Sequence, residues 1–105
     1  MRESEIEAYL VRRVRECGGL CRKVQFIGRR GAPDRVVIYQ GLTYWVELKA
    51  DSGGKVNILQ EREHKAMRLK GASVRVLHTK GKVDEFLRQT GLDSRPVNKW
   101  SELCE

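Results

Sequence analysis

The sequence contains no long apolar segment, and this absence excludes one class of protein at the outset. Nowhere do about eighteen apolar residues follow one another, so we expect no transmembrane helix. The first residues, Met-Arg-Glu-Ser-Glu-Ile-Glu, are polar and acidic and do not have the form of a secretory signal peptide. With 40% hydrophobic and 33% charged residues the composition is that of a globular chain. We therefore expect a cytoplasmic protein.

Cysteine is scarce, and the three cysteines, Cys17, Cys21 and Cys104, are odd in number. Without a secretory signal, we expect free thiols in a reducing compartment. The spacing Cys17-x-x-x-Cys21 could begin a zinc site. No second clustered pair follows it, however, and the two histidines, His64 and His78, are isolated. We therefore expect no structural zinc.

Acidic residues are outnumbered by basic ones. The 21 Lys and Arg residues exceed the 14 Asp and Glu residues, which gives a formal net charge of +7 and a pI near 9.7. Such an excess favours a polyanionic partner, most simply nucleic acid. The basic residues are spread along the chain, which indicates a face assembled by folding and not a basic tail. At 105 residues the chain forms one domain, because two hydrophobic cores would not fit.

A β-hairpin is the clearest local pattern in the chain. Residues Arg35–Tyr39 and Thr43–Leu48 are rich in β-branched and aromatic side chains, and Gln40-Gly41 lies between them as a turn. A two-residue loop fixes the register so that the numbers of paired residues sum to 81. A symmetric four-residue loop keeps this register, whereas a three-residue loop would break it.

This register places two carboxylates side by side. Asp34 lies opposite Glu47, and Lys49 shares their face because it is two residues further along the strand. Two carboxylates so close repel each other unless a cation lies between them. A hard divalent ion such as Mg²⁺ is one interpretation, since it takes oxygen ligands. The alternative is a partly buried pair that forms salt bridges with Lys49 and Arg35.

Hydrophobic periodicity predicts the rest of the fold. The expected order is helix, three strands, helix, strand and helix. It predicts an α/β fold with an α-β-β-β-α-β core and a small mixed sheet flanked by helices. We assign residues 1–90 to the domain and 91–105 to a tail that packs on the domain or on a dimer partner, through Trp100 and Leu103. The additional elements that we expect are helices over 3–17, 57–70 and 82–90 and strands over 20–27 and 73–77.

The first helix carries an acidic residue at the margin of its apolar face. Ser4 could cap the helix, with Glu7 three residues later completing a capping box. Glu7 points toward the core side, where its partner is the capped helix end, a nearby arginine or a functional site. The apolar stripe that defines this side is Ile6, Leu10, Val11 and Val14.

The second long helix begins with a capping pattern of its own. Asn57 caps it and Gln60 completes the capping box. We expect His64, one turn further, to be a surface residue. The apolar residues that we expect to pack inward are Leu59, Ala66 and Leu69, and the basic residues that we expect to face outward are Arg62, Lys65, Arg68 and Lys70.

Pro33-Asp34 followed by Glu47-Leu48-Lys49 resembles the PD-(D/E)xK nuclease signature, and more narrowly the chain resembles the VRR-NUC family of that superfamily. The resemblance covers roughly residues 3–78. The other matching parts, in order, are Glu7 with Val11-Arg12-Arg13, Gly18-Gly19, Gly31, Arg35, Gly41, Ala50, a Gly-rich loop, Gln60 and Gly71.

The resemblance implies a restriction-endonuclease-like fold and a metal site of Mg²⁺ or Mn²⁺. In this family pattern Asp34 and Glu47 ligate the metal, with the backbone carbonyl of Leu48 as a further ligand. Lys49 orients the attacking water or stabilises the phosphorus centre. Glu7 would complete the site from the first helix, with Glu3 as the fallback, and Gln60 would lie near the metal and the water as well as capping its helix.

The resemblance also implies a structure-specific DNA endonuclease, acting on branched DNA such as a Holliday junction or a flap, as a homodimer in a bacterial or phage-infected cell. No Walker A motif is present, so we expect no nucleotide cofactor. Arg29 and Arg30 form either a solvated turn or a phosphate contact. The alternative functions are a non-catalytic DNA-binding or accessory module and, third, a structural role. The residues that we expect to contact DNA are Lys23, Arg29, Arg30, Arg35 and Lys55.

Overall fold

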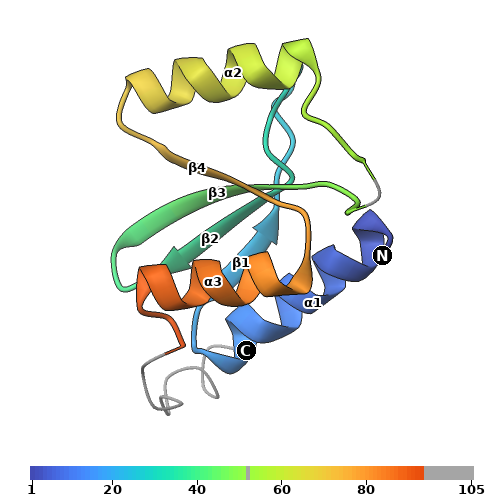
Figure 1. The fold of residues 1–105 in the computed structure, drawn as a ribbon. Coiled ribbons are helices and arrows are strands. Elements are labelled where there is room, and N and C mark those ends of the chain that lie inside the picture. The colour runs from blue at the N-terminus through green and yellow to red at the C-terminus, as the bar shows by residue number, and fades with distance from the viewer. Residues whose placement is uncertain (52, 94–105) are drawn as a thin grey trace.

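One four-stranded sheet with three helices makes up the fold in the computed structural model, which describes residues 1–51 and 53–93 (Figure 1). This is the predicted α/β order, including the third helix at the end. Among the described residues no helix has the length and apolar content needed to cross a membrane. The elements are α1 (Glu3–Glu16), β1 (Leu20–Lys23), β2 (Arg35–Tyr39), β3 (Leu42–Leu48), α2 (Ile58–Leu69), β4 (Ser73–Leu77) and α3 (Lys80–Thr90).

The sheet has the strand order β1-β2-β3-β4 and is mixed, as predicted. The first three strands pair antiparallel and β4 pairs parallel to β3. Tyr39 lies opposite Leu42, which confirms the predicted hairpin register. Gln40 and Gly41 both have positive φ angles, 48° and 80°, as a two-residue type I′ turn requires. The turn sequence therefore fixes which β2 and β3 residues share a face.

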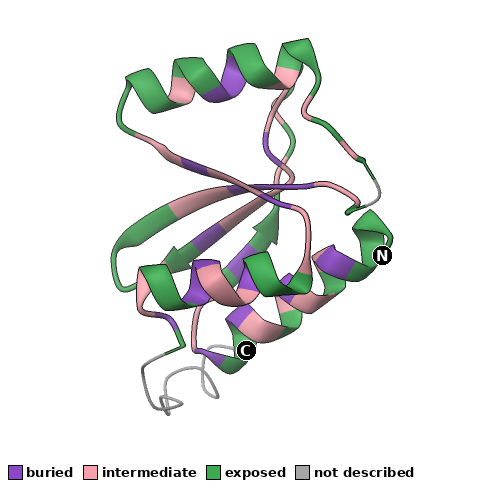
Figure 2. Cartoon of the chain, viewed as in Figure 1, coloured by how far each residue is buried: buried purple, intermediate pink, exposed green. Residues whose placement is uncertain are grey.

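The hydrophobic core lies between the sheet and the two helices α1 and α3, which contact each other (Figures 1 and 2). Tyr44 of β3 meets Phe86 of α3 edge to face, with 5.6 Å between ring centroids. Tyr9 of α1 donates a 2.7 Å hydrogen bond to Asp84 of α3. The fully buried side chains of this core include Ile6, Leu10, Val14, Val37, Val46, Leu48, Val83, Leu87 and Leu92.

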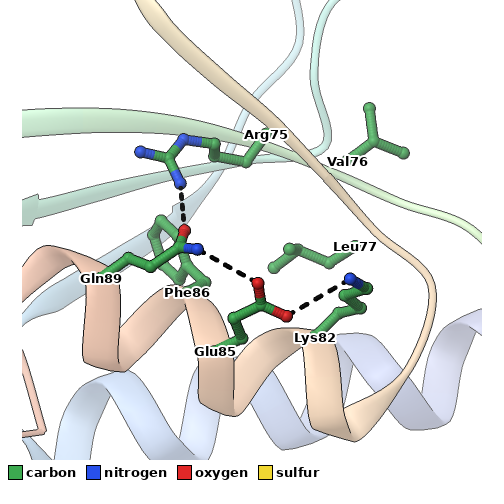
Figure 3. Close-up of a pocket in the computed structure, with 7 residues that line it drawn as sticks. All are labelled: Arg75, Val76, Leu77, Lys82, Glu85, Phe86 and Gln89. Atoms are coloured by element: carbon green, nitrogen blue, oxygen red, sulfur yellow. Dashed lines mark hydrogen bonds and ion pairs between the residues drawn. The ribbon is translucent and has the colours of Figure 1, made fainter.

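A chain of polar contacts braces α3 against β4 around a shallow pocket (Figure 3). Arg75 donates to Gln89 at 3.0 Å, and Gln89 in turn donates to Glu85 at 3.1 Å. Lys82 completes the chain with a 3.3 Å ion pair to Glu85. These contacts fix α3 but lie among exposed side chains, so each stabilises the fold only modestly.

Helix α2 lies on the opposite side of the sheet from α1 and α3, and it packs differently (Figure 1). Its buried residues are Glu63 and His64, and most of its surface is exposed (Figure 2). The expectation that Leu59, Ala66 and Leu69 pack inward was wrong, since all three are exposed. The expectation that His64 lies at the surface was also wrong, because its side chain is buried. The inward face is set by polar contacts with the hairpin, which override the apolar pattern.

Several element boundaries differ from the predictions. The strand expected to reach residue 27 ends at Lys23, and Ile27 is 98% exposed. Helix α1 is capped at Arg2, whose backbone N–H donates to Glu5, and not at Ser4. Helix α3 begins two residues earlier than expected because Thr79 accepts a 3.0 Å hydrogen bond from the Lys82 amide.

Two further predictions concern the ends of elements. Asn57 caps α2 as predicted: its side chain accepts from the Gln60 amide at 2.9 Å, and the Gln60 side chain accepts from the Asn57 amide at 3.0 Å. Leu92 is fully buried in the core. The predicted packing of Trp100 and Leu103 lies outside the described residues.

Candidate active site

Asp34 and Glu47 come together at the open end of the β2–β3 hairpin. Asp34 directly precedes β2 and Glu47 is the penultimate residue of β3, one step beyond the pair Arg35–Val46. The Asp34 carboxylate accepts a 2.8 Å hydrogen bond from the Leu48 amide, and its carbonyl accepts one from the Val24 amide at 2.9 Å. The backbone of three segments thus holds Asp34 beside Glu47.

Gly31 allows the approach to Asp34. It has a φ of +95°, and a Cβ atom there would lie 2.4 Å from the backbone oxygen of Leu59. The loop before β2 therefore touches the first turn of α2, and a side chain at this position would separate them. Pro33, between Gly31 and Asp34, is buried.

Glu47 is a buried acid with two donors on one oxygen. It is 1% exposed, and its Oε2 accepts from Gln60 Nε2 at 2.8 Å and lies 3.3 Å from Lys49 Nζ. Burial raises the pKa of Glu47 to about 7, with repulsion from Asp34 as the next cause and Lys49 opposing it. The site therefore disfavours the charged form of Glu47 unless further positive charge is brought to it.

Gln60 has both of the roles that the sequence suggested as alternatives. Its side-chain oxygen and its backbone amide complete the cap with Asn57, while its side-chain nitrogen reaches Glu47. One residue therefore links the start of α2 to the carboxylate. The helix cap is part of the site.

His64 is a site residue that the sequence analysis missed. It is 1% exposed, and its Nε2 lies 3.8 Å from Glu47 Oε1. Burial lowers its pKa, as do the nearby Arg68 and Lys49, so the neutral imidazole is favoured. The signal was present: His64 follows Gln60 by four residues and so lies on the same side of the helix.

Glu7 lies elsewhere. Its Oε2 accepts from Arg35 Nε at 2.7 Å and lies 3.9 Å from Lys23 Nζ. Successive side chains in an extended chain point to opposite faces, so Arg35 points away from the face of Asp34. It lies on the same face as the buried Val37, which is the core side. The partner of Glu7 is thus the nearby arginine, one of the alternatives open from the sequence. In residues 1–51 and 53–93, no three His, Cys, Asp or Glu side chains are grouped to hold a metal.

The other basic residues expected to contact DNA fall into two classes. Arg35 is engaged with Glu7 and mostly buried, whereas Lys55 is exposed. Arg29 donates to the buried Glu63 of α2 at 2.7 Å. Arg29 also borders an open groove of about 350 Å³ between the loop before β2 and α2, and the groove's lining is Gly28, Arg29, Arg30, Leu59, Arg62 and Glu63.

The donor chemistry of the hairpin end fits a hard divalent cation. Asp34, Glu47 and the Leu48 carbonyl all offer oxygen, the donor that Mg²⁺ and Mn²⁺ prefer. Burial and then repulsion from Asp34 raise the pKa of Glu47, and Lys49 opposes both only in part. A cation between them would remove this repulsion.

Comparison with known proteins finds similar proteins that match most of the chain. Over 78 residues the sequence is 44% identical to a protein of Acyrthosiphon pisum secondary endosymbiont phage 1 named "Putative nuclease p44", covering 73% of this chain and 83% of that protein. The fold is similar to a solved structure described as a VRR_NUC domain, with a TM-score of 0.78 and 38% identity over 82% of this chain and 94% of that one. No protein-family model matches the sequence.

Proposed function

This chain belongs to the VRR-NUC family of nucleases, and from that premise we propose that it is a metal-dependent, structure-specific DNA endonuclease that hydrolyses phosphodiester bonds. The observation that carries the proposal is the buried Glu47 beside Asp34, with Lys49 and Gln60 bound to one of its oxygens. This grouping offers negative charge for a cation and a positive charge for a phosphate in one place.

Asp34 and Glu47 would hold Mg²⁺ or Mn²⁺, with the Leu48 carbonyl as a further ligand. When bound, the cation supplies a water of lowered pKa and neutralises charge that develops on the phosphate. The Leu48 amide keeps one Asp34 oxygen fixed through its 2.8 Å hydrogen bond. Glu7 is paired with Arg35, which follows Asp34 in the sequence.

Lys49 and Gln60 are the two protein side chains that would support the reaction beside the metal ligands. The Lys49 ammonium lies 3.3 Å from Glu47 Oε2, and from this position it would serve as an electrostatic partner of the phosphate. Gln60 holds Glu47 Oε2 in place at 2.8 Å and has its own position fixed by the helix cap. Both side chains thus contribute preorganisation.

The arginine-lined groove beside the site would hold the DNA backbone. Arg30 and Arg62 border it together with Arg29, and guanidinium groups suit phosphate oxygens. Contacts of this kind position the strand without reading bases. This arrangement supports recognition of DNA shape, and hence branched substrates such as junctions or flaps.

A homodimer would provide the second cut that a junction requires. The exposed apolar side chains Ile58 and Leu69 on α2, with Leu69 75% exposed, offer surface to a second copy. Sedimentation equilibrium of the purified chain measures this state directly. The phage source of the 44% identical relative supports action on DNA inside an infected bacterial cell.

Cleavage of a labelled DNA panel tests the proposal. Four-way junction, flap, linear duplex and single strand are incubated with Mg²⁺, with Mn²⁺ and with EDTA, using wild type, Glu47→Gln and the control Glu85→Gln. Glu85 lies in the polar chain between α3 and β4, so its variant should cut as wild type does. We expect metal-dependent cutting of branched DNA that Glu47→Gln loses at least about 100-fold.

Two results would contradict this proposal. Tight DNA binding without cutting in either metal would make the chain an accessory DNA-binding module. Cutting by the wild type in EDTA at the rate seen with Mg²⁺ would show that the reaction does not need the metal.

A further inference from the structure

The Glu47 carboxylate has a second oxygen whose partner is missing. Glu47 Oε1 and His64 Nε2 are both buried without a hydrogen bond, and they lie 3.8 Å apart. An unsatisfied buried polar atom costs on the order of 1–3 kcal/mol. Because both atoms are closed off from solvent, the group that each can most readily bind is the other.

We propose that His64 is a positioning residue of this active site: its Nε2–H donates to Glu47 Oε1 when the cation is bound and thereby fixes the orientation of the metal-binding carboxylate. The inference rests on the proposed function, since it concerns the same carboxylate. His64 is not part of the nuclease signature Pro-Asp…Glu-x-Lys, so the inference adds a residue to the site.

The geometry gives His64 a role that no other donor of the site fills. Lys49 and Gln60 both approach Oε2, so the restraint that they place on the last side-chain torsion of Glu47 acts through one oxygen alone. That torsion is broad in glutamate, and a hydrogen bond to Oε1 restricts it. Gln60 and His64, four residues apart on α2, then hold the two oxygens from one helix face.

Binding of a cation would close the 3.8 Å gap. A carboxylate that ligates a metal is commonly oriented by a hydrogen bond from a neighbouring N–H. Catalytic hydrogen bonds are commonly long before substrate and metal are present. Hydrogen-bond partners of metal ligands typically contribute 10–100-fold to metal affinity.

The test is Mn²⁺ affinity without DNA, measured from the electron paramagnetic resonance signal of the free ion and by titration calorimetry. Wild type is compared with His64→Leu, which removes the donor, and His64→Gln, whose amide can place an N–H near the same point. We expect His64→Leu to bind Mn²⁺ at least about 10-fold more weakly and His64→Gln to recover most of the affinity. Near-ultraviolet circular dichroism shows whether each variant folds.

The outcomes separate this inference from the proposed function. Equal Mn²⁺ affinity in wild type and folded His64→Leu would overturn the role of His64 and leave the nuclease proposal intact. Equal weakening in His64→Leu and His64→Gln would overturn it too, because the donor would not be the cause. A wild type that binds no Mn²⁺ would overturn both proposals.

Discussion

Glu47 is the buried acid at the centre of the candidate site, and its environment makes it sensitive to pH. Burial and the neighbouring Asp34 raise its pKa to about 7, against an ordinary value of 4.5. The folded protein therefore binds a proton over a pH range in which the unfolded chain has already released it. Ionising Glu47 without a cation costs folding free energy.

The first prediction follows from that difference. In EDTA, the free energy of unfolding should fall as pH rises from about 4.5 to 7, because the raised folded pKa favours the protonated, folded form at low pH. The difference between the ordinary pKa of 4.5 and the folded pKa of about 7 sets an upper bound of about 3 kcal/mol on this loss. Urea unfolding of wild type and Glu47→Gln at pH 5, 6, 7 and 8 measures it.

The comparison with Glu47→Gln isolates the Glu47 contribution. His64 has a lowered pKa and acts in the opposite direction, since its folded form resists protonation as pH falls. This contribution is present in both proteins, so it largely cancels in the difference. If the two proteins show the same dependence on pH, the raised pKa of Glu47 is wrong. Added Mg²⁺ should restore most of the stability lost at pH 8.

At the scale of elements, the loop before β2 and the first turn of α2 form the tightest backbone approach at the site. We predict that Gly31→Ala destabilises the protein much more than Gly28→Ala. Both glycines have positive φ, +95° and +76°, which costs a side chain roughly 1–2 kcal/mol. At Gly31 the added Cβ would also lie 2.4 Å from the Leu59 carbonyl, whereas at Gly28 no atom lies within 4 Å.

The difference in unfolding free energy between these two variants is the measurement, taken by urea titration. Displacement of backbone at Gly31 should add roughly 1–3 kcal/mol to the cost seen at Gly28. Gly31→Ala should also reduce cleavage, because the loop delivers Asp34. Equal destabilisation by the two substitutions would mean that the loop moves freely away from α2.

The elements also show how far the sequence predicts the fold. The hairpin was predictable because Gln40-Gly41 fixes the register, and from it the neighbourhood of Asp34 and Glu47 followed. The inward face of α2 was not predictable from the sequence. The periodicity of apolar residues cannot reveal a helix that turns Gln60 and His64 toward a carboxylate from another element. Such contacts depend on tertiary structure.

The first helix gives a second example of the same limit. The sequence could place Glu7 on the core side of α1, but it could not choose among the possible partners. Arg35 points to that side because it follows Asp34 by one residue in an extended chain. The resulting 2.7 Å ion pair identifies Arg35 as the partner of Glu7.

For the whole molecule, the charge of +7 should appear as strong salt dependence of DNA binding. We predict that Arg30→Ala lowers the slope of log K against log salt by about 1, because it removes one phosphate contact. Arg35→Ala should leave the slope near the wild-type value, since Arg35 is paired with Glu7. Fluorescence anisotropy with a junction between 50 and 300 mM salt, roughly the range in which such slopes are resolved, measures both.

The matched pair of arginines makes the result informative. Arg35→Ala is expected to lower stability instead, because Glu7 would be left partly buried without its partner. If Arg35→Ala changes the slope as much as Arg30→Ala does, DNA reaches the Glu7 side of the sheet. The arginine-lined groove would then not be the main contact.

Helix α2 supplies Gln60 and His64 to the site, yet its buried residues are Glu63 and His64 and not apolar side chains of the core. The Gln60 contact attaches the start of α2 to Glu47, so if Glu47 binds the proposed cation, ion binding and helix docking are thermodynamically linked. Backbone amides of α2 would exchange with deuterium faster than those of α1 and α3 in the free protein, and would slow when the ion binds. This nuclease would complete its own fold only as its site is filled.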